Sequence, residues 1–360
     1  MAHDPPMPEP WDPDHGLSRA ELAACLTTSL EKLAESSHED APDFPETPDV
    51  RWFDEGWDCD VFVVPDRNGT RWLCKVPKRS NVQPWLHREA LVLKAFEEAK
   101  LGFVPSVGWT SWSEGDWRAG NSTRVAARES QSGSMSSDPA LPYDWMAISF
   151  VPGVPILHRL DQVDPSRLGR SYGDVLREVH GVSPGGIGER PALVTFDPSS
   201  LITSVDSAID ALRRHVASDV VVQVQRMVER VRERRSEEVA PVFIHGDLFP
   251  EHVFADPETW NVIGLIDWAD SSWGDPAADF CLLGWLLGDR FLDAAMDSYC
   301  GRPDATSEAR VELRRRAVVK GAVIGIHDIE VAEKGAPNVP LRQRIEVLER
   351  RAREGWLERV

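Results

Sequence analysis

The chain has 360 residues, 42% of them hydrophobic, and a formal net charge of −19. This length is sufficient for a bilobal domain or two domains, and the lack of an uninterrupted apolar run of about 18 residues argues against a membrane-spanning helix. The excess of acidic residues argues against a nucleic-acid partner, because the phosphate backbone binds lysine and arginine.

Residues 1–16 are acidic and proline-rich and are expected to be disordered. They lack the basic start and apolar core of a signal peptide. The five cysteines of the chain are odd in number and lack metal-ligand spacing. These features favour a cytoplasmic protein with reduced thiols, and we expect a monomer.

Residues 1–50 are predicted to be an N-terminal extension that contains one helix. Ser18 and Glu21 form a capping-box pattern at the start of this helix. Leucines then recur on one helical face, which predicts that the helix docks on a neighbouring element. They are Leu22, Leu26, Leu30 and Leu33. Residues 36–50 return to Pro, Asp and Glu and are expected to form a linker.

Residues 51–151 are predicted to form a small lobe in which two strands precede a helix. The strands, Asp60–Val64 and Arg71–Val76, flank an Asn-Gly pair at 68–69, a strong hairpin signal. Pro84 suits the first turn of the helix. One face of that helix carries Leu86, Ala90, Leu93 and Glu97.

Two further segments complete the small lobe. Residues 113–139 are rich in Ser and Gly and lose apolar periodicity, so we expect a mobile insertion. The apolar run Tyr143–Val151 follows and ends before Pro152 and Gly153.

Residues 152–360 are predicted to form a second, mainly helical lobe with the catalytic loop and acceptor-binding helices. Residues 204–237 are rich in Arg and Glu and are expected to form a long, solvent-facing helical stretch. Helical spacing also recurs in several other segments. They are 172–179, 277–299, 308–333 and 339–357.

The segment 242–268 holds the strongest functional signal. One apolar run delivers His245 and Asp247 into a turn, and a second delivers Asp267 at its end. Polar groups at strand ends indicate a site on a rigid frame. Asp247 and His252 are five residues apart, which is the interval between the catalytic Asp and the metal-binding Asn of kinases. The alternative is a surface hairpin whose acids are only solvated.

The motif HGDLFPEH (245–252), followed by IDW (266–268) and GDPAADF (274–280), resembles the aminoglycoside and macrolide phosphotransferases. Pro250 and His252 make it similar to the macrolide branch. The resemblance covers most of residues 51–300. It implies an α+β, bilobal, protein-kinase-like fold, with a small antiparallel-sheet N-lobe and a mainly helical C-lobe. It also implies an antibiotic kinase that uses Mg²⁺ and ATP or GTP.

The resemblance implies a role for each residue of the motif. Asp247 is expected to act on the acceptor hydroxyl, and His245 to support the loop. His252 and Asp267 are expected to hold Mg²⁺, although imidazole is an unusual ligand for this hard cation. Asp279 is expected to buttress the loop.

The nucleotide is expected to bind to residues of the small lobe. Lys75 and Glu89 resemble the strand lysine and helix glutamate of kinases. Gly56 lies where kinases carry a phosphate-covering loop, although it is the sole glycine there. The apolar run before Pro152 resembles the interlobe hinge of the family. Its expected nucleotide contacts are Ser149, Phe150 and Val151.

The acceptor is expected to be a small hydroxylated molecule, and the leading candidate is a macrolide 2′-hydroxyl. Residues 246–300 hold 11 acidic residues and one basic residue, a net charge of −10, which would also suit an aminoglycoside. Trp273 and Trp285 are candidates for the acceptor pocket. A kinase of another metabolite, a non-catalytic nucleotide-binding regulator and a metal-dependent hydrolase are the alternatives.

Overall fold

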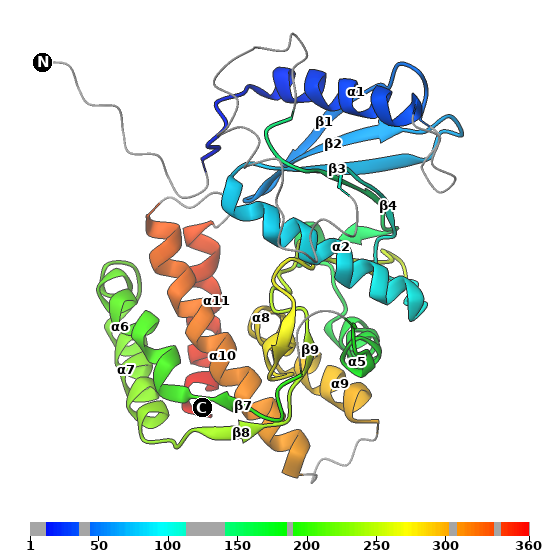
Figure 1. Cartoon of the computed structure of the whole chain (residues 1–360). Coiled ribbons are helices and arrows are strands. Elements are labelled where there is room, and N and C mark those ends of the chain that lie inside the picture. The colour runs from blue at the N-terminus through cyan, green and yellow to red at the C-terminus, as the bar shows by residue number, and fades with distance from the viewer. Residues whose placement is uncertain are drawn as a thin grey trace, which may run out of the picture. The chain divides into compact units, whose positions relative to one another are not determined.

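The computed structural model describes residues 12–35, 44–112, 141–185, 190–301, 308–334 and 340–359. The chain divides into two compact units, residues 1–98 with 104–151, and residues 99–103 with 152–360 (Figure 1). The expected insertion at 113–139, most of the expected linker and residues 1–11 lie outside the described residues. Within the described ranges, no helix is both long enough and apolar enough to cross a membrane.

The first unit is built on a five-stranded antiparallel sheet, in the order β1-β2-β3-β5-β4. Its strands are β1 (Arg51–Glu55), β2 (Cys59–Pro65), β3 (Arg71–Pro77), β4 (Val107–Thr110) and β5 (Met146–Ser149). The predicted β2–β3 hairpin is confirmed. The Asp66 carboxylate accepts hydrogen bonds from the amides of Asn68 and Thr70 in its turn. β1 was not predicted, because its described side chains are exposed and show no apolar alternation.

Two helices accompany this sheet, α1 (Arg19–Glu35) and α2 (Gln83–Glu98). The predicted capping box is confirmed, since the Ser18 amide donates to the Glu21 carboxylate at 2.8 Å. The leucine face of α1 packs on alternate residues of β2 and β3. The core that they form includes Leu22, Leu26, Leu30, Phe62, Val64, Cys74 and Val76. Side chains alternate between the two faces of a sheet, so Lys75 lies on the face opposite α1.

The expectation of disorder is wrong for residues 12–16. The Asp14 carboxylate accepts hydrogen bonds from the Ser80 amide, at 3.0 Å, and from the Tyr143 hydroxyl. The Asp14 amide donates to the carbonyl oxygen of Lys78 at 3.0 Å. These contacts tie the segment before α1 to Tyr143 and to the segment between β3 and α2, so it is part of the first unit.

The second unit combines short antiparallel strand pairs with helices, and Figure 1 shows the helices around β9. Its strands are β6 (Val154–Pro155), β7 (Val194–Phe196), β8 (Glu237–Val239), β9 (Val242–Ile244), β10 (Val253–Ala255), β11 (Val262–Leu265) and β12 (Ser272–Gly274). They pair as β11-β10-β6, β12-β9 and β7-β8. Its helices are α5 (Pro165–Gly181), α6 (Pro198–His215), α7 (Ser218–Arg232), α8 (Ala278–Leu287), α9 (Asp289–Cys300), α10 (Glu308–Glu333) and α11 (Leu341–Arg353).

The expected helical stretch at 204–237 consists of two helices for most of its length, and the expectation that it is solvent-facing is wrong. The backbone is extended at Val216 and Ala217, which separates α6 from α7. Both helices are also amphipathic, with buried faces. The buried residues include Val205, Ala208 and Leu212 of α6 and Val224, Val228 and Val231 of α7. The stretch 277–299 is likewise two helices, broken at Gly288, whose φ is 87°. A sheet unit and a mainly helical unit confirm the α+β fold class.

Candidate active site

The predicted motif occupies the ends of two strand pairs in the second unit. β9 leads directly into His245, and β10 begins one residue after His252. Asp267 follows β11, which pairs with β10. The short β9–β12 and β10–β11 pairs therefore hold both polar segments on paired backbone, as the sequence predicted.

The buried His245 side chain connects the segment that contains Asp247 to the segment that contains Asp267. It is fully buried, and its Nε2 donates to the Ile266 carbonyl oxygen at 2.9 Å. Its Nδ1 accepts from the Asp247 amide at 3.3 Å, and its ring lies 4.4 Å from the Trp268 ring. Burial lowers the pKa of His245 to about 4, so the ring is neutral near pH 7. A neutral ring with both nitrogens engaged supports the loop geometry.

Asp279, in the first turn of α8, holds the start of the loop. Its carboxylate accepts hydrogen bonds from the amides of His245 and Gly246 at 2.8 and 2.9 Å. Burial acts to raise the pKa of Asp279, but the hydrogen bond from His180 and the charges around it lower it below its usual value. The carboxylate therefore stays ionised and fixes two backbone amides.

His180 of α5 is a contributor that sequence reasoning missed. Its Nε2 donates to Asp279 Oδ2 at 3.0 Å, and its Nδ1 lies 2.9 Å from the Tyr299 hydroxyl. The available signal was its place beside the buried face of α5, one residue after Val179. A polar side chain adjoining such a face needs a buried partner, but the sequence does not say which.

His252 connects the two predicted acids. Its Nδ1 donates to the Asp247 carbonyl oxygen at 2.7 Å. The same Nδ1 lies 3.6 Å from Asp247 Oδ2, and Nε2 lies 3.6 Å from Asp267 Oδ2. Burial lowers the pKa of His252, but the charges of Asp267 and Asp247 raise it more, so the net shift is upward. Burial raises the pKa of Asp247 to about 6, although His252 opposes this shift.

The donor atoms of Asp267 and His252 fit a magnesium ion whose coordination shell is completed by other ligands. The Asp267 carboxylate is 42% exposed and offers the hard oxygen that Mg²⁺ prefers. His252 directs Nε2 toward the same carboxylate. Among the described residues, no group of three His, Cys, Asp or Glu side chains could hold a metal alone. Mg²⁺ commonly uses one or two protein ligands together with phosphates and water, and this pair suits that arrangement.

The predicted nucleotide residues lie on the first unit. Lys75 Nζ is 2.6 Å from Glu89 Oε2, and the Glu89 side chain is fully buried. Gly56 forms the β1–β2 turn, where its amide donates to the Cys59 carbonyl oxygen at 3.0 Å. The Phe150 ring meets Phe53 edge-on, with centroids 5.5 Å apart.

The remaining two hinge residues flank Phe150. Ser149 ends β5, and its amide donates to the Ser106 carbonyl oxygen at 2.9 Å. Val151 is half-buried.

The two candidate pocket tryptophans differ in environment. Trp285 is 2% exposed and packs against Gly325 and the Trp356 ring. It is a core residue, so we do not retain it in the acceptor site. Trp273, on β12, is half-buried, and its ring contacts Phe243 and the Arg190 guanidinium.

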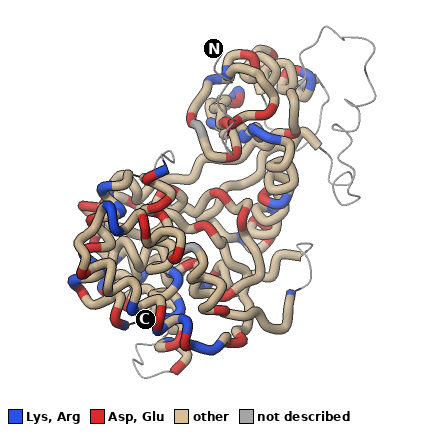
Figure 2. The backbone as a smooth tube through the Cα atoms, turned by 90° about the vertical axis from the view of Figure 1, so that its left-hand side faces the viewer, with Lys and Arg blue, Asp and Glu red and all other residues tan. Residues whose placement is uncertain are grey.

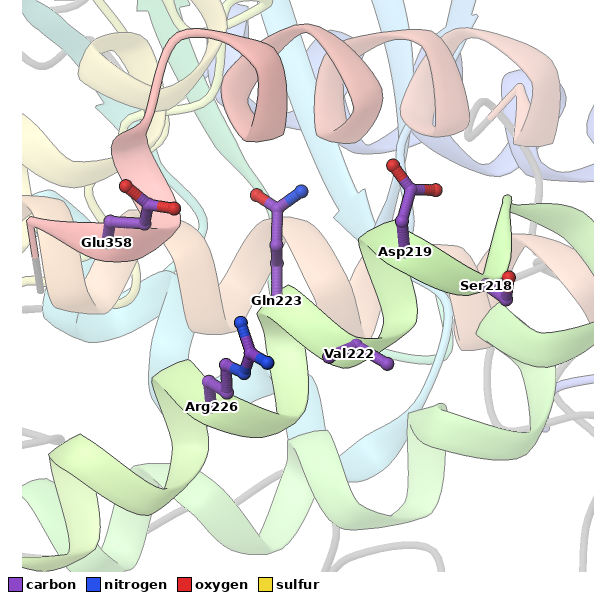
Figure 3. Close-up of a pocket in the computed structure, with 6 residues that line it drawn as sticks. All are labelled: Ser218, Asp219, Val222, Gln223, Arg226 and Glu358. Carbon is purple, nitrogen blue, oxygen red and sulfur yellow. The ribbon is translucent and has the colours of Figure 1, made fainter.

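A hollow of about 460 Å³ on the second unit contains none of the predicted site residues. It lies along α7 beside the short helix η3 (Trp356–Glu358), as Figure 3 shows. Its lining residues are Ser218, Asp219, Val222, Gln223, Arg226 and Glu358. We assign no part of the chemistry to it.

Comparison with known proteins gives one family match and many similar folds. A family model described as a phosphotransferase enzyme family matches residues 49–313. The uncharacterized protein YcbJ of Bacillus subtilis (strain 168) is 26% identical over 250 residues, 68% of this chain and 72% of that protein.

Two solved structures illustrate the similarity of fold. The GDP complex of an aminoglycoside 2′-phosphotransferase-IIIa mutant has a TM-score of 0.61 at 14% identity, covering 93% of this chain and 99% of that one. Macrolide 2′-phosphotransferase type I has a TM-score of 0.52 at 19% identity, with 92% and 98% covered. At these identities the likeness is one of fold.

Proposed function

The chain belongs to the phosphotransferase enzyme family, and from this premise we propose that it phosphorylates a hydroxyl of a small molecule with ATP or GTP. One observation carries the proposal. His252 lies 3.6 Å from both Asp247 and Asp267. An acceptor-activating carboxylate and a metal-binding carboxylate are thus adjacent, as phosphoryl transfer requires.

Each predicted residue has a distinct task in this proposal. Asp247 orients the acceptor hydroxyl and receives its proton as the new oxygen–phosphorus bond forms and the bond to the nucleoside diphosphate breaks. Asp267 and His252 hold Mg²⁺, which neutralises phosphate charge when bound. In the first unit, Lys75, held by Glu89, binds the nucleotide phosphates. Gly56 and the hinge residues Ser149, Phe150 and Val151 contact the nucleotide, and Asp279 and His245 keep the loop in place.

The acceptor that we propose first is a macrolide, phosphorylated at its 2′-hydroxyl. The acidic segment 246–300 argues less for a polycationic acceptor than its net charge implies, because arginines of α10 pair with several of its acids, among them Asp289, Asp293 and Asp297. Arg310 bonds to Asp297 at 2.6 Å, and Arg314 to Asp289 and Asp293 at 2.5 and 2.8 Å. Figure 2 shows blue segments among the red ones over the helical unit.

An aminoglycoside is the second candidate acceptor, and a specific observation supports it. The charges of Asp270, Asp267 and Glu251 all act to raise the pKa of Asp247. Negative charge therefore remains around Asp247 even though arginines of α10 pair with the aspartates of α9. This charge would attract the amino groups of an aminoglycoside.

The test is a turnover screen of the purified protein with Mg²⁺ and ATP or GTP against a macrolide, kanamycin and other hydroxylated antibiotics. Product mass is measured in each case. The expected result is a macrolide that gains one phosphoryl group. Nucleotide hydrolysis without any phosphorylated acceptor would support the hydrolase instead, and Mg²⁺-dependent binding without turnover would support the regulator.

A further inference from the structure

We propose that Asp144 is a positioning residue for nucleotide binding, because it fixes the rotation of α2, the helix that carries Glu89. The inference rests on the proposed function, in which the Lys75–Glu89 ion pair binds nucleotide phosphates. Sequence reasoning assigned no role to Asp144.

The Asp144 carboxylate joins the start of α2 to the sheet. It is 7% exposed and lies two residues before β5. Its Oδ2 accepts hydrogen bonds from Gln83 Nε2 at 3.2 Å and from His87 Nε2 at 3.0 Å, both on α2. Its Oδ1 accepts one from Ser111 Oγ at 3.3 Å. The Asp144 amide also donates to Gln83 Oε1 at 3.3 Å.

The bonds to Asp144 lie at one edge of the buried stripe of α2, and Glu89 lies within that stripe. Successive helical residues are rotated by about 100°, so Gln83 and His87, four apart, share one side. Glu89 is rotated by about 120° from Gln83 and about 160° from His87, and it lies between Leu93 and Phe96 on the buried face. Apolar packing is non-directional and by itself fixes the rotation of a helix less sharply than hydrogen bonds do. Directional bonds at two separate positions around the helix axis limit that motion.

Rolling of α2 would carry Glu89 away from Lys75. The ion pair is short, at 2.6 Å, and Glu89 has no solvent exposure, so its carboxylate has no water to replace the lysine. A second contact reinforces the same side of the helix, because the His87 ring lies 4.3 Å from the Trp112 ring. Asp144 thus acts on the nucleotide through Glu89 and Lys75.

The test measures nucleotide dissociation constants by calorimetry, with Mg²⁺ and without acceptor. We expect Asp144→Ala to raise Kd about 5- to 30-fold, the range that corresponds to losing a small number of buried polar contacts. The matched control is Ser111→Ala, which removes a bond to Asp144 and one from the Trp145 amide but leaves the bonds between Asp144 and α2. It is expected to keep the wild-type Kd. An unchanged Kd in Asp144→Ala overturns the proposal.

A double-mutant cycle separates positioning from general stabilisation. In a Glu89→Gln background, Asp144→Ala is expected to weaken binding no further. If the two substitutions raise the nucleotide Kd by independent factors that multiply in the double variant, Asp144 does not act through Glu89 and the proposal is wrong. Should Asp144→Ala fail to fold, His87→Phe serves in both measurements, because it keeps the ring beside Trp112 and loses the bond to Asp144.

The outcome is independent of the acceptor. A protein that binds nucleotide but phosphorylates nothing contradicts the proposed function, while its Kd values still decide the role of Asp144. Conversely, if the protein is an active kinase and Asp144→Ala leaves its nucleotide Kd unchanged, the proposed function stands and the role of Asp144 is wrong.

Discussion

His245 and Ile266 are joined by a hydrogen bond of 2.9 Å, in which the imidazole Nε2 donates to the carbonyl oxygen. The other ring nitrogen accepts from the Asp247 amide at 3.3 Å. The two bonded backbone groups belong to Asp247 and to the neighbour of Asp267. One buried side chain therefore sets the spacing of the two carboxylates proposed to do the chemistry.

His245→Leu should destabilise the protein and reduce turnover together. The substitution leaves the Ile266 carbonyl and the Asp247 amide without this partner, and each unpaired buried group costs about 1–3 kcal/mol. Urea unfolding measures the loss. The control is His158→Leu, the same change at an exposed histidine. Equal stability of the two variants would contradict the linking role.

Gly246→Ala should distort the catalytic loop. Gly246 has a φ of 85°, and an added Cβ would lie 2.9 Å from the Asp270 carbonyl oxygen. Gly355, in the same unit, has a φ of 72° with no atom within 4 Å of its Cβ position. Both alanines carry the left-handed cost of about 1–2 kcal/mol, but only Gly246→Ala adds a clash. It should therefore lose more stability and also turnover, whereas Gly355→Ala should keep wild-type activity.

Asp247→Asn should reduce turnover by about 10²- to 10⁴-fold, the usual contribution of a general base. Nucleotide affinity should stay near the wild-type value, because the proposed partner of Asp247 is the acceptor hydroxyl. Steady-state kinetics measures the turnover, and calorimetry measures the nucleotide affinity. Asp256→Asn, in the exposed β10–β11 turn, is a suitable control, since Asn can also cap a turn. Retention of more than about a tenth of wild-type turnover would sink the assignment.

Asp267→Ala should abolish the enhancement of nucleotide binding by Mg²⁺, and His252→Ala should weaken it less. Asp267 offers an anionic oxygen, whereas a neutral imidazole nitrogen is a poorer ligand for this cation. Calorimetry with and without Mg²⁺ compares the variants. The metal assignment fails if Asp267→Ala and the wild type show the same enhancement.

The sequence determined features that depend on neighbours along the chain. An Asn-Gly turn between apolar alternations specified the β2–β3 hairpin, and Ser18 with Glu21 specified the start of α1. The segment around Asp247 and Asp267 was found in the same way. Strand periodicity, turn chemistry and helix capping act within a few residues, so the linear pattern records them.

Only the tertiary structure decided which distant polar groups meet. His180 reaches Asp279 across 99 residues, Gln83 reaches Asp144 across 61, and Ser80 reaches Asp14 across 66. Buried polar groups must find partners, but their identity depends on how the helices and strands pack. No local periodicity encodes that packing, which is why the groups proposed to hold Asp279 and α2 in place emerged only from the folded chain.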